Sequence, residues 1–156
     1  YAGLLSQQPA TATGLKSILQ DYFNLPVEII PFQGQWINIA DDNSTQLSLK
    51  SNYNQLGCNT FIGQRFWDLS AKFRIYIGAL DYKQFKSLLP NTTTLSTLKE
   101  LVKYYVGIEY NFDFQLEILA QEIPQCQLSS SDPLNLGWNT WLGHNRNRGN
   151  ANDLII

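Results

Sequence analysis

The chain has 156 residues, a formal net charge of -2 and a pI near 5.3. That length allows one or two small domains with cores of their own, and the slight acidity excludes the broad basic surface that binds a nucleic-acid backbone. No apolar run reaches the roughly 20 residues of a spanning helix, so we expect no direct insertion into a membrane. The sequence contains neither a signal-peptide pattern nor any methionine, and we expect a cytoplasmic piece of a longer protein.

Residues 1–10 are read as the end of a preceding helix and a linker. A helix is predicted next, because apolar residues recur at i, i+3, i+4, i+7 and i+8, the spacing that buries one face. These residues are Leu15, Ile18, Leu19, Tyr22 and Phe23. Thr11 or Thr13 can cap the start, Asn24 can end the helix in the left-handed conformation, and Pro26 forbids its continuation. A strand carrying Val27 and Ile29 is expected to follow.

Residues 38–55 are rich in Asn, Asp, Ser and Gln and are predicted to form a long exposed loop. Apolar and polar residues then alternate over 72–77, which indicates a half-buried strand ended by Gly78. Asp81 is expected to cap a short helix that Pro90 stops. The polar run 91–94 is read as a linker and as the candidate boundary between two domains.

The second half shows the same order of elements. Residues 98–106 carry the same helical stripe, closed by Gly107, and residues 110–118 alternate so regularly that they give the strongest strand signal in the chain. A second polar loop is expected over 125–135. The end of the sequence, 153–156, is predicted to be a strand.

Two sequence matches in the same order indicate an internal duplication. The helix starting at Leu15 matches the one at Leu98, a shift of 83 (98 minus 15), and the segment Leu56–Gly63 matches Leu136–Gly143, a shift of 80 (136 minus 56). The predicted fold class is therefore α+β, with two pseudo-symmetric helix-strand-loop-strand repeats, 11–90 and 91–156. We expect mostly antiparallel strands, helices on one face, and packing about a pseudo-twofold axis.

The repeated segment has the pattern Leu-Gly-x-Asn-Thr-x-x-Gly. Its glycines permit positive φ, and its Asn and Thr can bond their own backbone, so a tight structural turn leading into a strand is expected. A phosphate cradle is the alternative. The Lys and the following helix that such a cradle needs are absent, which favours the turn.

No catalytic, cofactor-binding or metal site is predicted. Cys58 and Cys126 lack zinc-ligand spacing and are expected to be reduced and partly buried. Asp68, Lys72 and Arg74 are expected to form intrachain charge pairs instead of an acid–base site. His144, the only histidine, is expected in a solvated loop, since no nucleophile motif accompanies it.

The chain resembles the TssG family, also called ImpH or VasB, of type VI secretion baseplate proteins. The resemblance rests on motifs spread along nearly the whole chain: Tyr1-Ala2-Gly3-Leu4-Leu5, Asp21-Tyr22-Phe23, Pro26-Val27, Phe32-x-Gly34-x-Trp36, Leu56-Gly57, Ile62-Gly63-x-Arg65-x-Trp67-Asp68, Lys72-Phe73-Arg74-Ile75, Phe85, Leu89-Pro90, Tyr105-Val106-Gly107, Glu122-Ile123-Pro124, Leu136-Gly137-Trp138 and Trp141-Leu142. The family usually has Gly-Pro-Leu where this chain has Gly78-Ala79-Leu80, and Pro-Gly where it has Pro90-Asn91. Both departures lie at predicted turns.

The resemblance implies a structural scaffold with no catalysis or cofactor, which links TssF and TssE to the trimeric adaptor TssK at the inner face of the bacterial envelope. We add the hypothesis that the matched loops 38–55 and 125–135 are the segments that dock TssK. Two rival functions stay open. One is a saccharide-binding module lined by Trp, Tyr and Asn, and the other is a hydrolase that uses His144.

Large amphipathic and basic side chains are the candidates for partner contacts. The candidates are Trp36, Tyr53, Trp138, Trp141, Arg146 and Arg148. For Trp36, and for Trp67, filling the core is the preferred expectation and partner anchoring the alternative. Trp138 and Trp141 stand at the repeat positions of Cys58 and Phe61, and this extra aromatic bulk in the second repeat points to a partner.

Overall fold

The computed structural model describes residues 1–6, 9–45, 53, 55–124, 126, 134–141 and 149–156, and the account below concerns these residues. Their contacts divide the chain into two compact units. Unit 1 comprises Tyr1–Pro31 and Phe73–Ile156, and unit 2 comprises Phe32–Lys72. We describe each unit by itself. The repeat boundaries predicted at 10/11 and 90/91 are a different division of the chain and stay a prediction.

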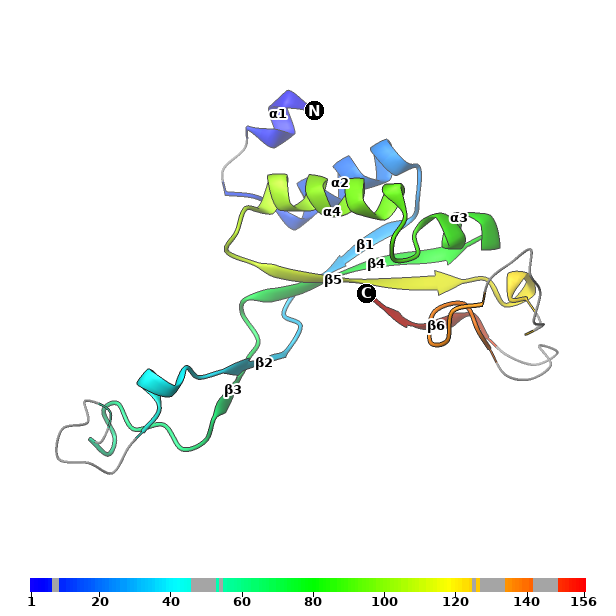
Figure 1. The fold of residues 1–156 in the computed structure, drawn as a ribbon. Coiled ribbons are helices and arrows are strands. Elements are labelled where there is room, and N and C mark those ends of the chain that lie inside the picture. The colour runs from blue at the N-terminus through cyan, green and yellow to red at the C-terminus, as the bar shows by residue number, and fades with distance from the viewer. Residues whose placement is uncertain (7–8, 46–52, 54, 125, 127–133, 142–148) are drawn as a thin grey trace. The chain divides into compact units, whose positions relative to one another are not determined.

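Unit 1 is built on a four-stranded sheet in the order β1-β4-β5-β6. Its strands are β1 (Val27–Ile30), β4 (Lys72–Leu80), β5 (Asn111–Ile118) and β6 (Ala151–Ile155). β1 pairs antiparallel with β4, with Val27 opposite Ile77, and β5 pairs antiparallel with β6, with Leu116 opposite Leu154. β4 and β5 run in the same direction (Figure 1). The predicted α+β class with mostly antiparallel strands is confirmed.

The helices of unit 1 are α1 (Ala2–Leu5), α2 (Ala12–Phe23), α3 (Tyr82–Ser87) and α4 (Thr93–Val106), with a short 3₁₀ turn η2 (Ala120–Glu122). Figure 1 shows α2, α3 and α4 on one face of the sheet. Their stripes meet the inward residues of β4 and β5. The fully buried core side chains include Ile18, Leu19, Ile75, Ile77, Leu80, Phe85, Leu88, Leu98, Val102, Phe114, Leu116 and Ile118.

The predicted helix ends are confirmed except at the end of α3, which stops at Ser87 before it reaches Pro90. The Thr11 hydroxyl accepts from the Gly14 amide at 3.2 Å, and Asn24 ends α2 at φ 51°. Asp81 and Gln84 form a capping box at the start of α3. Gly107 ends α4 at φ 83°, where any other residue would be strained. Of the predicted α2 stripe, Tyr22 is the exception, because its side chain is 56% exposed.

Two predicted boundaries in unit 1 are wrong. β4 does not end at Gly78 but continues to Leu80, because the Gly78 amide donates to the Pro26 carbonyl at 3.0 Å and the Leu80 carbonyl accepts from Leu119 at 3.1 Å. The run 91–94 is no linker. Thr92 caps α4, its hydroxyl accepting from the Leu95 amide, and the two residues after Thr92 lie within the helix.

The strand order bears on the predicted two-fold packing. The predicted repeat makes β5 the counterpart of β1, and β6 the counterpart of β4. Across the sheet, the first strand of a repeat therefore alternates with the second strand of a repeat. A two-fold axis between the two pairs would reverse the order of the second pair and place β6, not β5, next to β4. The order of the strands therefore does not match packing of both pairs about a two-fold axis. A translation along the sheet does not relate the pairs either, because β1 and β5, like β4 and β6, run in opposite directions. The duplication itself stays a prediction, supported by the equivalent antiparallel pairs β1-β4 and β5-β6.

Unit 2 contains a two-stranded antiparallel hairpin that the sequence reading missed. Its strands are β2 (Gln35–Asn38) and β3 (Arg65–Asp68). A 3₁₀ turn, η1 (Asp41–Asn43), lies between them in the sequence, shortly after β2. Trp36 lies opposite Trp67 in the register. At the base of the hairpin the Gln33 amide donates to the Lys72 carbonyl at 2.9 Å. Among the described residues of unit 2, none is buried.

Candidate functional site

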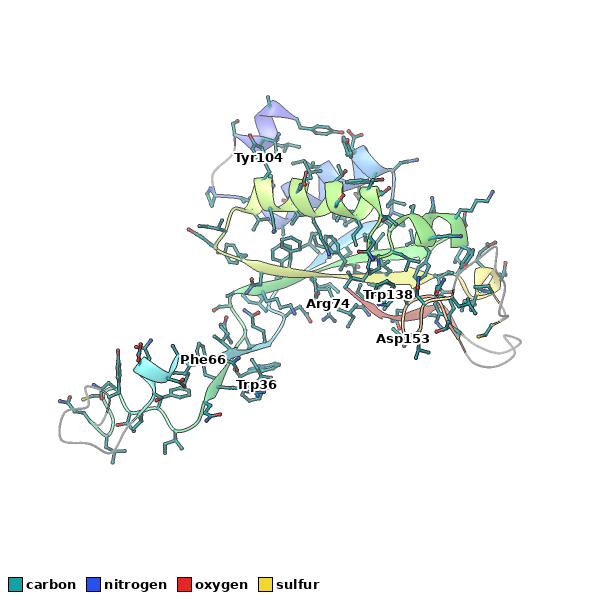
Figure 2. The ribbon with its side chains drawn as sticks, viewed as in Figure 1. Trp36, Phe66, Arg74, Tyr104, Trp138 and Asp153 are labelled. Atoms are coloured by element: carbon teal, nitrogen blue, oxygen red, sulfur yellow. The ribbon has the colours of Figure 1, made fainter. Side chains whose placement is uncertain are left out.

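Most of the large apolar side chains described in unit 2 are exposed, and we call the exposed ones the hairpin surface. Its members are Phe32, Trp36, Leu56, Phe61, Ile62, Phe66, Trp67 and Leu69, all at least 37% exposed. Trp36 and Phe66 are labelled in Figure 2. A soluble domain places single apolar side chains on its surface, but a whole unit whose large apolar residues face solvent marks an interaction surface.

The centre of the hairpin surface is a cross-strand tryptophan pair. The rings of Trp36 and Trp67 lie 5.2 Å apart between centroids, edge to face at 65°. Gly34 provides room for this arrangement, because a Cβ there would stand 1.8 Å from the Trp67 ring. Trp36 is 64% exposed and Trp67 50%. The expectation that these two residues fill a core is wrong, and the partner-anchoring alternative for Trp36 is the one that its position allows.

A tight turn follows in unit 2 at residues 55–59. The amides of Cys58 and Asn59 both donate to the Gln55 carbonyl, at 3.1 and 3.2 Å, and the Asn59 side-chain oxygen accepts from the Gln55 amide at 3.0 Å. Gly57 has φ 79°, which L side chains rarely adopt. The turn places Leu56 at its tip with 89% of its side chain exposed.

Unit 1 contains a second turn of the same kind at residues 135–139. The amides of Trp138 and Asn139 donate to the Asn135 carbonyl at 3.1 and 3.2 Å, and the Asn139 side-chain oxygen accepts from the Asn135 amide at 2.7 Å. Gly137 has φ 81° and Leu136 is 93% exposed. The predicted structural turn is thus confirmed in both copies.

The surroundings of the two turns differ. Asn139 is 3% exposed, and Trp138 and Trp141 are half-buried against the core of unit 1, with the Trp141 ring 5.6 Å from that of Phe85. Asn59 and Cys58 are exposed. The extra aromatic bulk of the second copy therefore packs, at least in part, against its own core.

The remaining interface candidates have separate outcomes. Tyr53 is half-buried and its hydroxyl donates to the Asn43 side-chain oxygen at 3.1 Å. Arg146, Arg148 and His144 lie outside the described residues. The partner role of all six candidates stays a prediction. Sequence reading missed Phe32, Phe66, Leu56 and Leu136. The repeat placed a leucine before each Gly, but it did not show that this leucine is exposed.

The face of the sheet opposite the helices carries a buried ion pair between β4 and β5. Arg74 binds Asp113 through two hydrogen bonds of 2.7 and 2.8 Å, and reaches Gln115 at 3.4 Å. The Asp113 side chain is 9% exposed, and its hydrogen bond raises the pKa of Arg74. The predicted charge pairing is thus found for Arg74, with a partner from the second repeat.

Asp68 does not join that pair. Its carboxylate accepts from the Ser70 amide and hydroxyl at 3.0 and 2.7 Å and from the Ala71 amide at 3.3 Å. These hydrogen bonds lower the pKa of Asp68, and the bond from the Ser70 amide has the largest effect. Asp68 therefore acts as the closing residue of a turn after β3.

A second polar link on this face joins Tyr76 to Glu117. The Tyr76 hydroxyl donates to the Glu117 carboxylate, which also accepts from the Ala79 amide and the Asn150 side-chain amide, each at 3.1 Å. The bond from Tyr76 lowers the pKa of Glu117, and burial together with this carboxylate raises the pKa of Tyr76 to about 12. These groups are structural, since each is occupied by an intrachain partner.

The described residues include no group of three or more His, Cys, Asp or Glu that could hold a metal ion. Cys58 and Cys126 are free, as predicted, but both are exposed instead of partly buried. Within the part of the chain that the structure describes, no helix has the length and apolar character needed to cross a bilayer.

Comparisons with known proteins agree with the resemblance found in the sequence. No curated protein matches. A chain of a solved structure, the "type VI secretion system TssK-TssF-TssG baseplate subcomplex", matches with a TM-score of 0.70 and 18% identity. The match covers 96% of this chain and 62% of that one, so this chain spans less than two thirds of its relative. The family described as "Type VI secretion, TssG" matches residues 1–143. The chain therefore belongs to the TssG family of type VI secretion proteins.

Proposed function

We propose that this chain is a non-catalytic scaffold of a type VI secretion baseplate, which joins TssF and TssE to the adaptor TssK. It works in the bacterial cytoplasm at the inner face of the envelope, and needs neither a cofactor nor nucleic acid nor direct insertion into the membrane. Family membership and the likeness to a chain of a TssK-TssF-TssG subcomplex support this role.

The observation that carries the proposal is the composition of unit 2. Its described residues include no buried side chain, while eight large apolar residues stand exposed. An isolated two-stranded hairpin is marginally stable at best in water. Such a segment gains its stability by burying its apolar side chains against another subunit, so unit 2 is built for assembly.

Unit 1 supplies the rigid part of the scaffold. Its core is closed by α2, α4 and the sheet, and the Arg74–Asp113 pair fixes β4 to β5. We assign contacts with TssF to the surface of unit 1, and contacts with TssK to the predicted loops 38–55 and 125–135, of which residues 46–52, 54, 125 and 127–133 lie outside the described part of the chain. The loops are matched by the repeat, so each engages one copy of TssK. Unchanged TssK stoichiometry after deletion of both loops would refute this assignment.

The sharpest test removes unit 2 while keeping unit 1 intact. Gln33 and Lys72 are joined by a hydrogen bond between their backbones. Residues 34–71 can therefore be replaced by Asn-Gly, a pair suited to a two-residue hairpin turn. The shortened chain is co-expressed with TssF and TssK and the complex is purified on TssF. We expect TssF to be retained and the TssK content to fall. The thermal unfolding of the shortened chain alone serves as the folding control.

Unchanged TssK content in this variant would assign TssK binding elsewhere and contradict the role given to unit 2. Loss of TssF with full retention of TssK would reverse the assignment of the two surfaces.

The saccharide-binding alternative concerns the same tryptophans. Trp36 and Trp67 are exposed, as sugar-stacking residues are, but their rings meet at 65° and share no flat platform. Calorimetric titration with oligosaccharides is expected to give no saturable heat. A saturable heat that disappears in Trp36→Ala would favour the binding module over the scaffold.

A further inference from the structure

The two tight turns described above share more than their sequence. In each, two backbone amides donate to one carbonyl, and the oxygen of an Asn side chain accepts from the amide of the first residue of the turn. In each, a glycine adopts a positive φ, 79° at Gly57 and 81° at Gly137. In each, the residue before that glycine is a leucine, 89% exposed at position 56 and 93% at position 136. The same side chain is thus presented by the same backbone at two places.

The turn itself does not need these leucines. Its hydrogen bonds come from backbone groups and from the Asn side chains, and neither Leu56 nor Leu136 belongs to the core cluster or packs against it. A polar residue would fill the position and avoid contact between a large apolar side chain and water. One exposed leucine is ordinary on a protein surface, but the same one at the tip of two matching turns calls for a common cause.

We propose that Leu56 and Leu136 are two copies of one contact, each inserting into the same apolar pocket on a different copy of one partner subunit. Two identical protrusions fit two identical pockets, so the partner is a subunit bound twice by this chain. The inference rests on the proposed function, in which that subunit is TssK. Leu56 and Leu136 directly follow the segments 38–55 and 125–135, so the inference adds the turn at the end of each segment to the region that binds TssK.

The two copies are not equally prepared for binding. The turn at 135–139 is fixed by the buried Asn139 and by Trp138 against the core, whereas the turn at 55–59 has only exposed side chains. A contact that is already ordered loses less conformational entropy on binding. The Leu136 turn is therefore expected to take up the first copy of TssK and the Leu56 turn the second.

The test uses full-length protein in complex with TssF, titrated with TssK and analysed by native mass spectrometry. Leu136→Ser and Leu56→Ser are compared with two controls in unit 1, Ile108→Ser and Tyr104→Ser, whose side chains are exposed and lie outside both the turns and the hairpin surface. Each turn variant is expected to weaken one of the two binding steps by about tenfold or more, and each control by less than about twofold.

A second variant tests the backbone without removing the leucine. A Cβ at Gly57 would meet no atom within 4 Å, so Gly57→Val changes only the preferred φ of this exposed turn. We expect the same binding loss as for Leu56→Ser, with unchanged thermal unfolding of the chain.

The outcomes separate the inference from the function. If the double variant L56S/L136S binds two copies of TssK as tightly as the controls do, the leucine contact is wrong while the scaffold role stands. If even the unmodified chain binds no TssK, the proposed function itself fails. Weakening of both steps by either single variant would show that the two turns form one site, and would overturn the assignment of separate copies.

Discussion

Unit 1 and unit 2 differ in where they keep their apolar side chains. Unit 1 buries its helical stripes and strand faces in one core, with Phe85 and Phe114 fully inaccessible. Unit 2 holds four-residue strands and leaves Trp36, Phe66 and Trp67 in contact with solvent. The difference teaches that one unit of a chain can be stabilised by a core of its own while the described residues of the other leave large apolar side chains uncovered. Of the four predictions below, the first and the last test whether the two units unfold separately, and the middle two test what holds the sheet of unit 1 together.

The largest effect is expected from Phe114→Ala, which removes a fully buried ring from β5. Such truncations cost about 3–5 kcal/mol because they combine lost burial with a cavity. The matched substitution in unit 2, Phe66→Ala, starts from a ring that is 37% exposed and is expected to cost less than about 1 kcal/mol. Urea unfolding followed by far-UV circular dichroism measures both. Equal losses would mean that unit 2 contributes to the same cooperative fold.

The next effect is expected from Asp113→Ala, which leaves the Arg74 guanidinium without its charged partner. Since the Arg74 side chain is 21% exposed, water will solvate part of the charge, and we expect a loss of about 2 kcal/mol rather than the full penalty for a buried ion. Replacing both residues in a double-mutant cycle, with the exposed Asp153→Ala as control, isolates the pair. A coupling energy near zero would show that the pair does not hold β4 to β5.

A smaller effect is expected from pH acting on the Tyr76–Glu117 link. The pKa of Glu117 is lowered from 4.5 in the folded state, so its contribution is complete above about 4.5 and is lost as the pH falls through the folded value. The pKa of Tyr76 is raised from 10.0 to about 12, so its contribution is complete below 10 and is lost as the pH rises toward 12. Screening by solvent keeps each below about 1 kcal/mol.

The pH test compares unfolding free energies of the unmodified chain with those of Glu117→Gln and Tyr76→Phe. We expect Glu117→Gln to flatten the profile on the acid side and Tyr76→Phe to flatten it on the alkaline side. Profiles that keep their full slope in both variants would contradict the roles given to these groups.

The smallest effect on the stability of unit 1 is expected from Trp36→Ala. Aromatic pairs contribute about 0.5–1.5 kcal/mol beyond their burial, and here that contribution is confined to the β2-β3 hairpin. Hydrogen exchange of the β2 and β3 amides should become faster, while the unfolding midpoint of unit 1 stays unchanged. A shifted midpoint would show that the two units are energetically coupled.

The elements of unit 1 were predictable because each carries its own local signal. The stripes of α2 and α4 repeat with the helical period, and the caps at Thr11, Asn24 and Gly107 are the residue types that their conformations require. β5 alternates over eight residues between a buried and a polar face. Asn91 also fits, since it adopts φ 72° and Asn tolerates that region.

The elements of unit 2 were missed for a physical reason. β2 and β3 have four residues each. β2 alternates only between half-buried and exposed residues, and β3 does not alternate, because unit 2 has no buried residue among those described. The burial of tryptophan is the usual expectation, and it failed for Trp36 and Trp67. These two tryptophans are exposed because the described residues of unit 2 form no core. Whether a core forms depends on the whole folded chain and cannot be read from a short stretch of sequence.

The candidate site was predictable in part. The repeated Leu-Gly-x-Asn segment indicated two equivalent turns, and both exist with matching hydrogen bonds. The exposure of Leu56 and Leu136 could not be read from that pattern, because the spacing of a turn does not say which way its tip faces. The strand order, likewise, depends on contacts between segments far apart in the sequence.

The order β1-β4-β5-β6 has one more consequence, for solubility. It leaves β1 and β6 as the outer strands, which have only four and five residues and carry Glu28 and Asp153, both exposed. Short, charged outer strands resist unwanted pairing with strands of other molecules. The sheet of unit 1 therefore discourages edge-to-edge aggregation, although unit 1 also exposes apolar side chains, Ile108 and Ile155 among them, as unit 2 and the two turns do.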